Sequence, residues 1–251
     1  MNKKALVIGG TSGIGFSISK LFAQKNYDVT IVSSNKQNLE TALIDLKKIN
    51  TNCSYIKCDL KIETDVDNLE KIILNEGDNI DCVVLCSCIG LFGKFNDLNK
   101  EHFLNYFQTF VVSYLKILKT IFNSKNNKTR VIYLSSYAAH FNLPNYNIYS
   151  FVKLTIDNFL EKIRSENEKG RLLTVYPGSV NTNFDLNSER VGNFKFRESK
   201  NKKSAIYTAE KIFKSYENYN NYLHANILMK FLFFFKDIIT KLLNYFLRFF
   251  Y

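Results

Sequence analysis

The stretch that decides the fold is Ala5-Leu6-Val7-Ile8-Gly9-Gly10-Thr11-Ser12-Gly13-Ile14-Gly15. Its first four residues form a short apolar run typical of a buried strand, and the segment Phe16–Lys25 that follows suits an amphipathic helix. Gly9 allows a tight turn out of the strand, and Gly13 and Gly15 allow close backbone approach to a phosphate and to the strand. Free N–H groups at a helix start attract anions. The stretch therefore predicts a phosphate-binding turn.

Strand-like and helix-like segments alternate along the rest of the chain. Short runs rich in branched residues predict buried parallel strands at Val29–Val32, Cys82–Leu85, Val131–Leu134 and Leu172–Val175, with Ser54–Lys57 as a weaker candidate. Helical periodicity occurs at Asn38–Ile49, Val66–Leu74, Phe103–Phe122 and Ile156–Arg164. This alternation predicts an α/β fold, a Rossmann-type doubly wound parallel sheet with helices on both faces. We expect one dinucleotide-binding catalytic domain over residues 1–222.

Composition narrows the class of protein. The chain has 251 residues, of which 46% are hydrophobic and 23% charged, which is ordinary for one globular domain. Its net charge of +11 would attract polyanions, but the basic residues are scattered, so we expect no nucleic-acid partner. The apolar run Ala5–Ile8 is too short for a signal peptide.

The cysteines indicate a reducing compartment. Their number is odd and three of them lie in one apolar run, which argues against a disulfide framework. Cys86-Ser87-Cys88 lacks the two-residue spacer of common zinc sites, and the chain has only 3 His, so we expect no metal. A cytoplasmic location fits these features. The five are Cys53, Cys58, Cys82, Cys86 and Cys88.

Three residues in the second half of the chain suit proton transfer to a reduced carbonyl. Tyr149 and Lys153 are four apart and share one face of a helix, and Ser136 follows the strand Val131–Ser135. A free Tyr has a pKa near ~10, and a neighbouring Lys is expected to lower it. Ser136 can donate a hydrogen bond to the carbonyl oxygen. These residues are the predicted catalytic group.

The glycine turn, Tyr-x-x-x-Lys and the Ser thirteen residues earlier together resemble the short-chain dehydrogenase/reductase family over about residues 3 to 222. The resemblance implies an NAD(P)-dependent oxidoreductase that usually forms homo-oligomers. It implies that Asp59 contacts the adenine and that Pro177-Gly178-Ser179-Val180-Asn181-Thr182 lies beside the nicotinamide. The cofactor-binding residues we expect are Gly9, Thr11, Ser12, Gly13, Ile14, Gly15, Ser33, Ser34, Asn35, Asp59, Leu60, Tyr149, Lys153, Pro177, Gly178, Val180 and Thr182.

The residues after the second predicted strand bear on the choice of cofactor. In NAD-binding sheets an acidic residue there binds the ribose hydroxyls, whereas this chain has Ser33-Ser34-Asn35-Lys36. Because no carboxylate there would repel a 2′-phosphate, the sequence favours NADP over NAD. Asp59 has an alternative interpretation as a plain helix N-cap.

The chain departs from the family pattern at three places. Ile8 replaces a usual Thr, and Leu85-Cys86-Ser87-Cys88 replaces the usual Asn-Asn-Ala-Gly, unless Gly90 supplies that glycine through an alignment shifted by two. Phe110 replaces an Asn of the proton relay. These departures support a second hypothesis, a membrane-associated cofactor-binding or scaffold protein with little turnover.

The leading hypothesis is NAD(P)H-dependent interconversion of a ketone and a secondary alcohol, on a small-molecule substrate that is hydrophobic or lipid-like. Gly93-Lys94-Phe95 and the apolar C-terminus look similar to 3-ketodihydrosphingosine reductases.

Residues 223–251 form an apolar tail. Its longest uninterrupted apolar run, Phe231–Phe235, is far below the ~20 residues that span a bilayer. As a helix it is amphipathic, and one interpretation places it in an anionic membrane surface as a peripheral anchor. The other packs it on the body or on a second subunit. Its polar side chains share one narrow helical face: Lys230, Asp237, Lys241, Asn244 and Arg248.

Overall fold

The computed structural model describes residues 2–76, 79–123, 128–141, 143–166, 170–193, 199 and 201–235. In this part of the chain, seven parallel strands form one sheet in the order β11-β7-β6-β4-β1-β2-β3. This confirms the predicted doubly wound α/β fold. The strands are β1 (Lys4–Ile8), β2 (Asp28–Ser33), β3 (Ser54–Lys57), β4 (Ile80–Leu85), β6 (Arg130–Leu134), β7 (Leu172–Tyr176) and β11 (Tyr222–His224).

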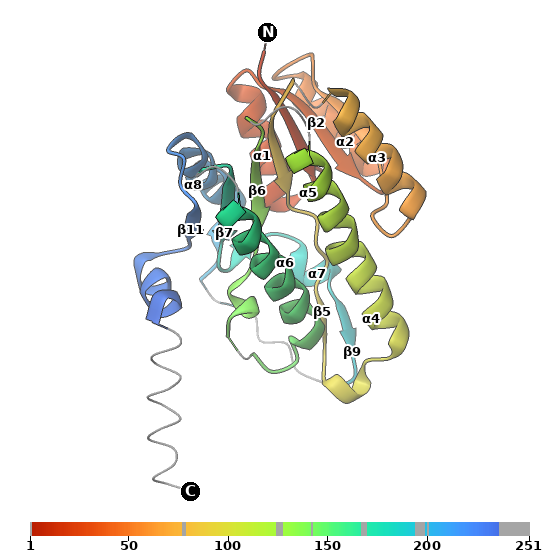
Figure 1. Cartoon of the computed structure of the whole chain (residues 1–251), viewed down its shortest axis with the longest axis vertical. Coiled ribbons are helices and arrows are strands. Elements are labelled where there is room, and N and C mark those ends of the chain that lie inside the picture. The colour runs from red at the N-terminus through yellow and green to blue at the C-terminus, as the bar shows by residue number, and fades with distance from the viewer. Residues whose placement is uncertain are drawn as a thin grey trace, which may run out of the picture.

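Helices cover both faces of the sheet (Figure 1). On one face lie α1 (Gly13–Gln24), α2 (Lys36–Lys47) and α8 (Ala205–Glu217), and α1 packs directly on α8. On the other face lie α3 (Glu63–Glu76), α5 (Ser113–Asn123) and α6 (Asn147–Glu166). Side chains along β1 point alternately to the two faces of the sheet, so Leu6 and Ile8 pack in one core and Ala5 and Val7 pack in the other.

The strand order places the site. The chain runs outward from β1 through β2 to β3 on one side, then returns to β4 and continues through β6 and β7 on the other. The order reverses between β1 and β4, and ligands of such sheets bind beyond the carboxyl ends of the strands at this reversal. The predicted glycine turn leaves β1 at that point.

The single predicted helix Phe103–Phe122 is interrupted in the structure. It consists of α4 (Lys100–Phe107), a π-helical segment (Gln108–Val112) and α5. The π-helical segment adds a residue to a turn without breaking the apolar face, so helical periodicity alone does not reveal it.

Two pairs of short strands connect loops that lie outside the main sheet. β5 (Leu91–Gly93) pairs with β9 (Glu189–Val191), and β8 (Val180–Asn181) pairs with β10 (Lys203–Ser204). Between β8 and β9 lies the short helix α7 (Phe184–Asn187). The β5–β9 pair ties the loop after β4 to the loop after β7, and both loops border the predicted site.

The C-terminal segment enters the fold before the tail begins. Leu223 and His224, which the sequence assigned to the tail, belong to β11. Residues 227–235 are helical, and the predicted tail residues from 236 onward lie outside the described residues. Among the described helices, none is long and apolar enough to cross a membrane.

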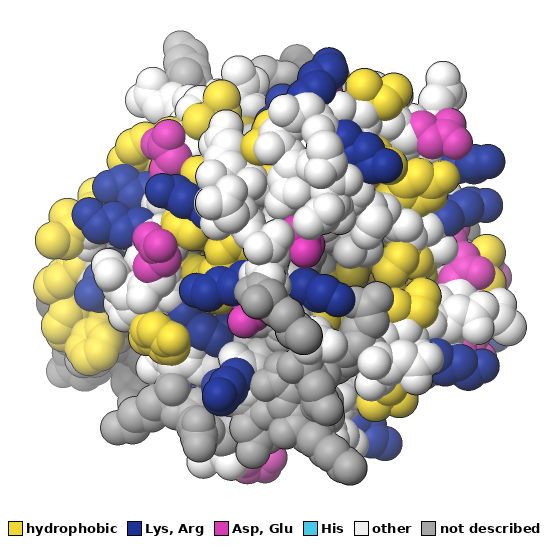
Figure 2. All heavy atoms as spheres, turned by 90° about the horizontal axis from the view of Figure 1, so that it is seen from above, with side chains coloured by type: hydrophobic (Ala, Val, Ile, Leu, Met, Phe, Trp, Pro, Cys, Tyr) yellow, Lys and Arg dark blue, Asp and Glu magenta, His cyan; other side chains and the backbone are white. Residues whose placement is uncertain are grey.

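Basic side chains do not gather in one patch on the face drawn in Figure 2. There the Lys and Arg side chains are interspersed with acidic, apolar and other polar groups. The described residues of this face therefore show no basic patch of the kind that binds a polyanion.

Candidate active site

The turn after β1 has the backbone that its glycines predicted. Gly9 has φ +88°, and a Cβ there would lie 2.6 Å from the backbone nitrogen of Ser87. Only glycine fits such a position. Ser12 is the N-cap of α1, and its side chain does not cap the helix, so it does not occupy the N–H groups of the first turn. Ile14 and Gly15 lie in the first turn of α1, whose free N–H groups suit a phosphate.

The predicted nicotinamide loop meets this turn. A Cβ on Gly13 would lie 3.2 Å from Cγ2 of Thr182, so the two segments are in contact although they are far apart in sequence. Gly178 has φ +71°, which turns the chain sharply after Pro177. Val180 then enters β8. The structure thus brings the predicted pyrophosphate and nicotinamide residues together.

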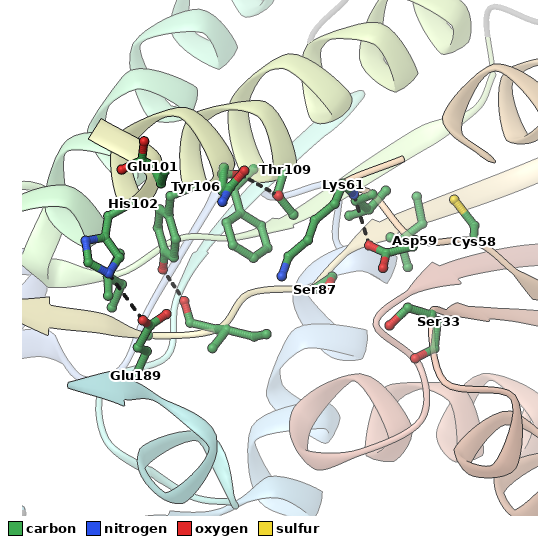
Figure 3. Close-up of a pocket in the computed structure, with 18 of the residues that line it drawn as sticks. Ser33, Cys58, Asp59, Lys61, Ser87, Glu101, His102, Tyr106, Thr109 and Glu189 are labelled. Carbon is green, nitrogen blue, oxygen red and sulfur yellow. Dashed lines mark hydrogen bonds and ion pairs between the residues drawn. The ribbon is translucent and has the colours of Figure 1, made fainter. Parts of the chain in front are cut away.

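A cavity of about 420 Å³ lies beyond the ends of β1, β2, β3 and β4, and Ile8, the last residue of β1, is part of its lining (Figure 3). Ser33, Ser34, Asp59 and Leu60 line one end of it, as the sequence predicted for the adenosine half of a cofactor. The cavity continues past Ser87 toward α4 and β9. Its size and its place at the strand ends suit a nucleotide.

Two predicted residues at this end have local roles. Asn35 is the N-cap of α2 and accepts a hydrogen bond from the Asn38 backbone at 3.0 Å. Asp59 accepts one from the backbone nitrogen of Lys61 at 3.0 Å, and α3 begins only at Glu63. Asp59 therefore shapes the loop before α3, and it still borders the cavity. Thr11 Oγ1 lies 3.5 Å from Ser33 Oγ and links the two loops.

The three predicted catalytic residues come together at the ends of β6 and α6. Ser136 follows β6 and accepts a hydrogen bond from the backbone nitrogen of Ala138 at 3.2 Å. The Ser136 side chain also interacts with the Tyr149 phenol and favours its ionised form. Lys153, one turn later on α6, donates from Nζ to the Leu134 carbonyl at 2.7 Å. All three therefore share one small volume, and Tyr149 and Lys153 are buried.

Burial sets the protonation state of Tyr149. It raises the pKa of the phenol, nearby Cys88 acts in the same direction, and the interaction with Ser136 acts against both. The sequence led us to expect a pKa lowered by Lys153. In the structure the Lys153 amino group is held by the Leu134 carbonyl, and desolvation dominates. Tyr149 is therefore neutral and able to donate a proton.

Aromatic rings surround Tyr149. The ring centroids of Phe92, Phe184 and Tyr146 lie 5.7, 5.8 and 6.2 Å from that of Tyr149. Phe92 belongs to β5 and Phe184 to α7, so the β5–β9 pairing places these rings. The surroundings of the reacting hydroxyl are therefore apolar.

The segment 86–88 after β4, which departs from the family pattern, is held in place by hydrogen bonds. The backbone nitrogens of Cys86 and Ser87 both donate to the Ile8 carbonyl at 2.9 Å. The Tyr114 hydroxyl donates to the Ser87 carbonyl at 2.5 Å. Burial raises the pKa of Cys86 to about 12, so this thiol packs as a neutral group. Cys88 and Gly90 both lie outside the left-handed region. A Cβ on Gly90 would nevertheless lie 2.3 Å from Ser188 Oγ and 2.6 Å from the Phe92 ring, so the close packing there suits glycine.

Phe110 lies in the π-helical segment and packs edge-on against Tyr106, with centroids 4.8 Å apart. Both side chains line the cavity. Nearby, Ser113 Oγ donates to the Leu60 carbonyl at 2.8 Å. The position that carries a relay Asn in the family is thus an apolar cavity wall here.

Sequence reasoning missed the residue one turn beyond Lys153. Asp157 is buried, and its Oδ2 lies 2.8 Å from Ser135 Oγ and 2.7 Å from His140 Nε2. The spacing of four that joins Tyr149 to Lys153 also joins Lys153 to Asp157, and that repeat was the available signal. Among the described residues no group of His, Cys, Asp and Glu could hold a metal ion.

Comparison with known proteins identifies the family. Residues 3–190 match the short-chain dehydrogenase family. The chain belongs to this family. It is therefore an NAD(P)-dependent oxidoreductase, as the glycine turn and the Ser, Tyr and Lys residues predicted. An uncharacterized oxidoreductase of Staphylococcus epidermidis is 23% identical over 184 residues, 72% of this chain and 79% of that protein.

Solved structures share the fold of this short-chain dehydrogenase. A short-chain dehydrogenase from Sphingobium yanoikuyae in complex with NADPH has a TM-score of 0.80 at 14% identity, over 90% of this chain and 88% of that one. An alcohol dehydrogenase from the archaeon Thermococcus sibiricus, complexed with 5-hydroxy-NADP, has a TM-score of 0.76 at 19% identity, over 88% and 95%. The narrower resemblance to 3-ketodihydrosphingosine reductases stays a prediction.

Proposed function

We propose that this short-chain dehydrogenase interconverts a ketone and a secondary alcohol on an apolar substrate, with NADP(H) as the cofactor. The observation that carries the proposal is the assembled group of Ser136, Tyr149 and Lys153 inside a cage of aromatic rings. The fold's relative from Thermococcus sibiricus is an alcohol dehydrogenase, which agrees with this reaction. The intact geometry also favours an enzyme over a scaffold with little turnover.

The residues of the turn and the cavity fit a dinucleotide. The sharp turn at Gly9 and the start of α1 would hold the pyrophosphate, and Ser33, Ser34 and Asp59 would hold the adenosine half. Gly13 and Thr182 meet where the nicotinamide half would pass. When bound, the nicotinamide supplies or accepts the hydride.

The chain's own residues supply the proton and the orientation. The Ser136 hydroxyl can donate to the substrate carbonyl oxygen, and the neutral Tyr149 phenol can give its proton to the oxygen as negative charge develops. Lys153 is fixed at the end of β6, next to both groups. Phe92 and Phe184 make the surroundings apolar, which favours a hydrophobic substrate and strengthens these hydrogen bonds.

A panel of ketones and secondary alcohols of increasing chain length tests the reaction. We expect oxidation of NADPH with ketones, measured by its absorbance. We also expect kcat/KM to rise by about fourfold per added methylene, which corresponds to the ~0.8 kcal/mol of a buried CH₂ group. Aldehydes and carboxylic acid derivatives serve as controls. Turnover confined to polar, short substrates would contradict the apolar site.

The described start of the tail supports a membrane surface as a partner. In the helix at 227–235, Ile227, Phe231 and Phe234 are 86%, 57% and 80% exposed, beside the cation Lys230. Large apolar side chains next to a cation suit an anionic lipid surface. The inner side of this helix packs on the body through Phe233, and we propose that its outer side binds the lipid surface.

Flotation with lipid vesicles tests this partner. We expect the full chain to float with phosphatidylserine-containing vesicles and less with pure phosphatidylcholine. Replacing Phe231 and Phe234 with Ser should reduce flotation, because it removes apolar side chains that can enter the acyl boundary. The matched control is Ile44→Ser, an exposed residue on α2. If the full chain stays in the aqueous fraction with both vesicle types, the membrane partner is wrong.

A cut after Tyr222 would remove Leu223 and His224 from β11, so a truncation that spares the sheet must come after His224. The resemblance to the family also predicts a homo-oligomer, and the cysteine content predicts a cytoplasmic location; both stay predictions.

A further inference from the structure

Three consecutive residues, Leu134 to Ser136, each interact with one residue of α6, and the three α6 residues are spaced by four. Two of these interactions are hydrogen bonds that hold α6 against the end of β6. The first two pairs carry catalytic residues, and the third extends the same pattern by one helical turn. The pairs are Ser136 with Tyr149, Leu134 with Lys153, and Ser135 with Asp157.

Asp157 is the centre of a buried polar cluster. Its Oδ2 accepts hydrogen bonds from Ser135 Oγ at 2.8 Å and from the Tyr176 hydroxyl at 3.0 Å, and it lies 2.7 Å from His140 Nε2. Burial and the charge of Asp157 raise the pKa of Tyr176, so this phenol keeps its proton and donates it. A buried carboxylate is stable only with such partners. Asp157 therefore ties α6 to β6, to the loop after it and to β7.

The C-terminal segment covers this cluster. The Phe233 ring lies 4.6 Å from the His140 ring and 4.9 Å from that of Tyr176, between centroids. His224 stacks on Tyr176 at 5.0 Å with an interplanar angle of 11°. Phe234, the next residue along, is 80% exposed. One side chain of this helix thus shields the cluster, while its neighbour faces away.

We propose that Asp157 is a positioning residue of the active site and that Phe233, by covering the His140–Asp157 pair, makes the C-terminal helix part of the same positioning network. This inference rests on the proposed catalytic role of Ser136 and Tyr149. Without the carboxylate, the hydroxyl of Ser135, next to Ser136, loses its acceptor, and the loop is free to shift against α6. A misplacement of about 1 Å in such a group can cost 100-fold in rate.

Substitutions of Asp157 test the first part of the proposal, the positioning role of this residue. Asp157→Asn keeps an oxygen that can accept from Ser135 and Tyr176, whereas Asp157→Leu keeps only the volume. We expect kcat to fall about 10-fold in the first and about 100-fold in the second, with NADPH affinity within about twofold of wild type. These kcat values are measured with the ketone of the panel that has the highest kcat/KM. Partial retention of kcat by Asn is the signature of positioning through this oxygen.

Two outcomes would overturn the role of Asp157. One is an unchanged kcat in both variants. The other is a parallel fall of kcat, NADPH affinity and Tm, which would mark Asp157 as a residue of general stability. Tyr176→Phe removes one donor without removing a charge, and it keeps the test possible if Asp157→Leu does not fold.

Phe233→Ala and Phe234→Ala form a matched pair that tests the second half. The chain has only 3 His, so their ring signals can be followed by NMR. Burial lowers the pKa of His224, and the charges of Lys230 and His140 add to this. We expect Phe233→Ala to shift the His140 and His224 signals and to raise the pKa of His224 toward its usual value. His102, which lies on α4 beside Glu189, should not change.

The same two variants are also compared by hydrogen exchange in the loop after β6 and by kcat. Phe233→Ala should speed hydrogen exchange across residues 134–140 and lower kcat by about threefold to tenfold, and Phe234→Ala should change neither. Equal effects of the two variants, or no effect of Phe233→Ala on His140, would refute the coupling. NMR and hydrogen exchange need no substrate, so they test the coupling even if the proposed ketone reaction fails.

Discussion

Tyr149→Phe is expected to lower kcat for ketone reduction by at least about 100-fold, because the variant has no proton to give to the forming alkoxide. The ring volume is kept, so the contacts with Phe92 and Phe184 remain and the fold should be unaffected. NADPH affinity should stay within about twofold, since the phosphate turn is built from other residues. Steady-state kinetics and fluorescence titration measure the two quantities.

Tyr146→Phe is the control for this experiment. Tyr146 is an aromatic neighbour of the same site, with its ring centroid 6.2 Å from that of Tyr149, and Ser136 interacts with the Tyr149 phenol. Its loss of a hydroxyl should leave kcat within about threefold of wild type. If Tyr149→Phe retains near-normal kcat, or Tyr146→Phe is equally damaged, another group donates the proton.

NADPH is expected to bind at least about tenfold more tightly than NADH, because Ser33 and Ser34 can donate to a 2′-phosphate and no carboxylate directly follows β2 to repel it. Lys36 is exposed at the same end, 3.7 Å from Glu40, and can turn toward a bound phosphate. Ser34→Asp adds the acidic group typical of NAD sites and should reverse the preference.

The control for Ser34→Asp is Gln37→Asp, which adds the same charge three residues later, on α2. It should leave the ratio of the two dissociation constants within about threefold. Tighter binding of NADH by the wild-type chain would show that Ser33 and Ser34 do not select the phosphate.

The features that sequence predicted are those with local causes. The glycine turn depends on positive φ at Gly9 and Gly13, which only a few residue types tolerate, so composition reveals it. The strands of the sheet are buried on both faces and read as apolar runs. The spacing of Tyr149 and Lys153 is fixed by the helical repeat. Each of these signals lies within about ten residues of sequence.

The features that sequence missed depend on partners far along the chain. Asp157 receives its role from His140 and Tyr176, which no local pattern connects to it. β5 and β9 have three residues each, too few for a recognisable alternation, and they form only because the two loops meet. The raised pKa of Tyr149 follows from burial, which spacing alone does not show.

The same reason explains the boundary placed before Leu223. The composition changes there, and the change marks the start of the apolar tail. Backbone pairing with β7 nevertheless continues through His224, and the packing of Phe233 reaches further still. The change in composition therefore marks the point where the surroundings of the side chains change. The folded unit continues beyond it.

Transfer of deuterium from NADPH labelled at C4 of the nicotinamide tests the central claim most directly. The protein is incubated with each stereoisomer of labelled NADPH and the best ketone of the panel, and the product alcohol is analysed by mass spectrometry. We predict deuterium at the carbinol carbon with one stereoisomer only, and none above background with Tyr149→Phe. A wild-type protein that binds NADPH but transfers no deuterium to any ketone of the panel would contradict the account.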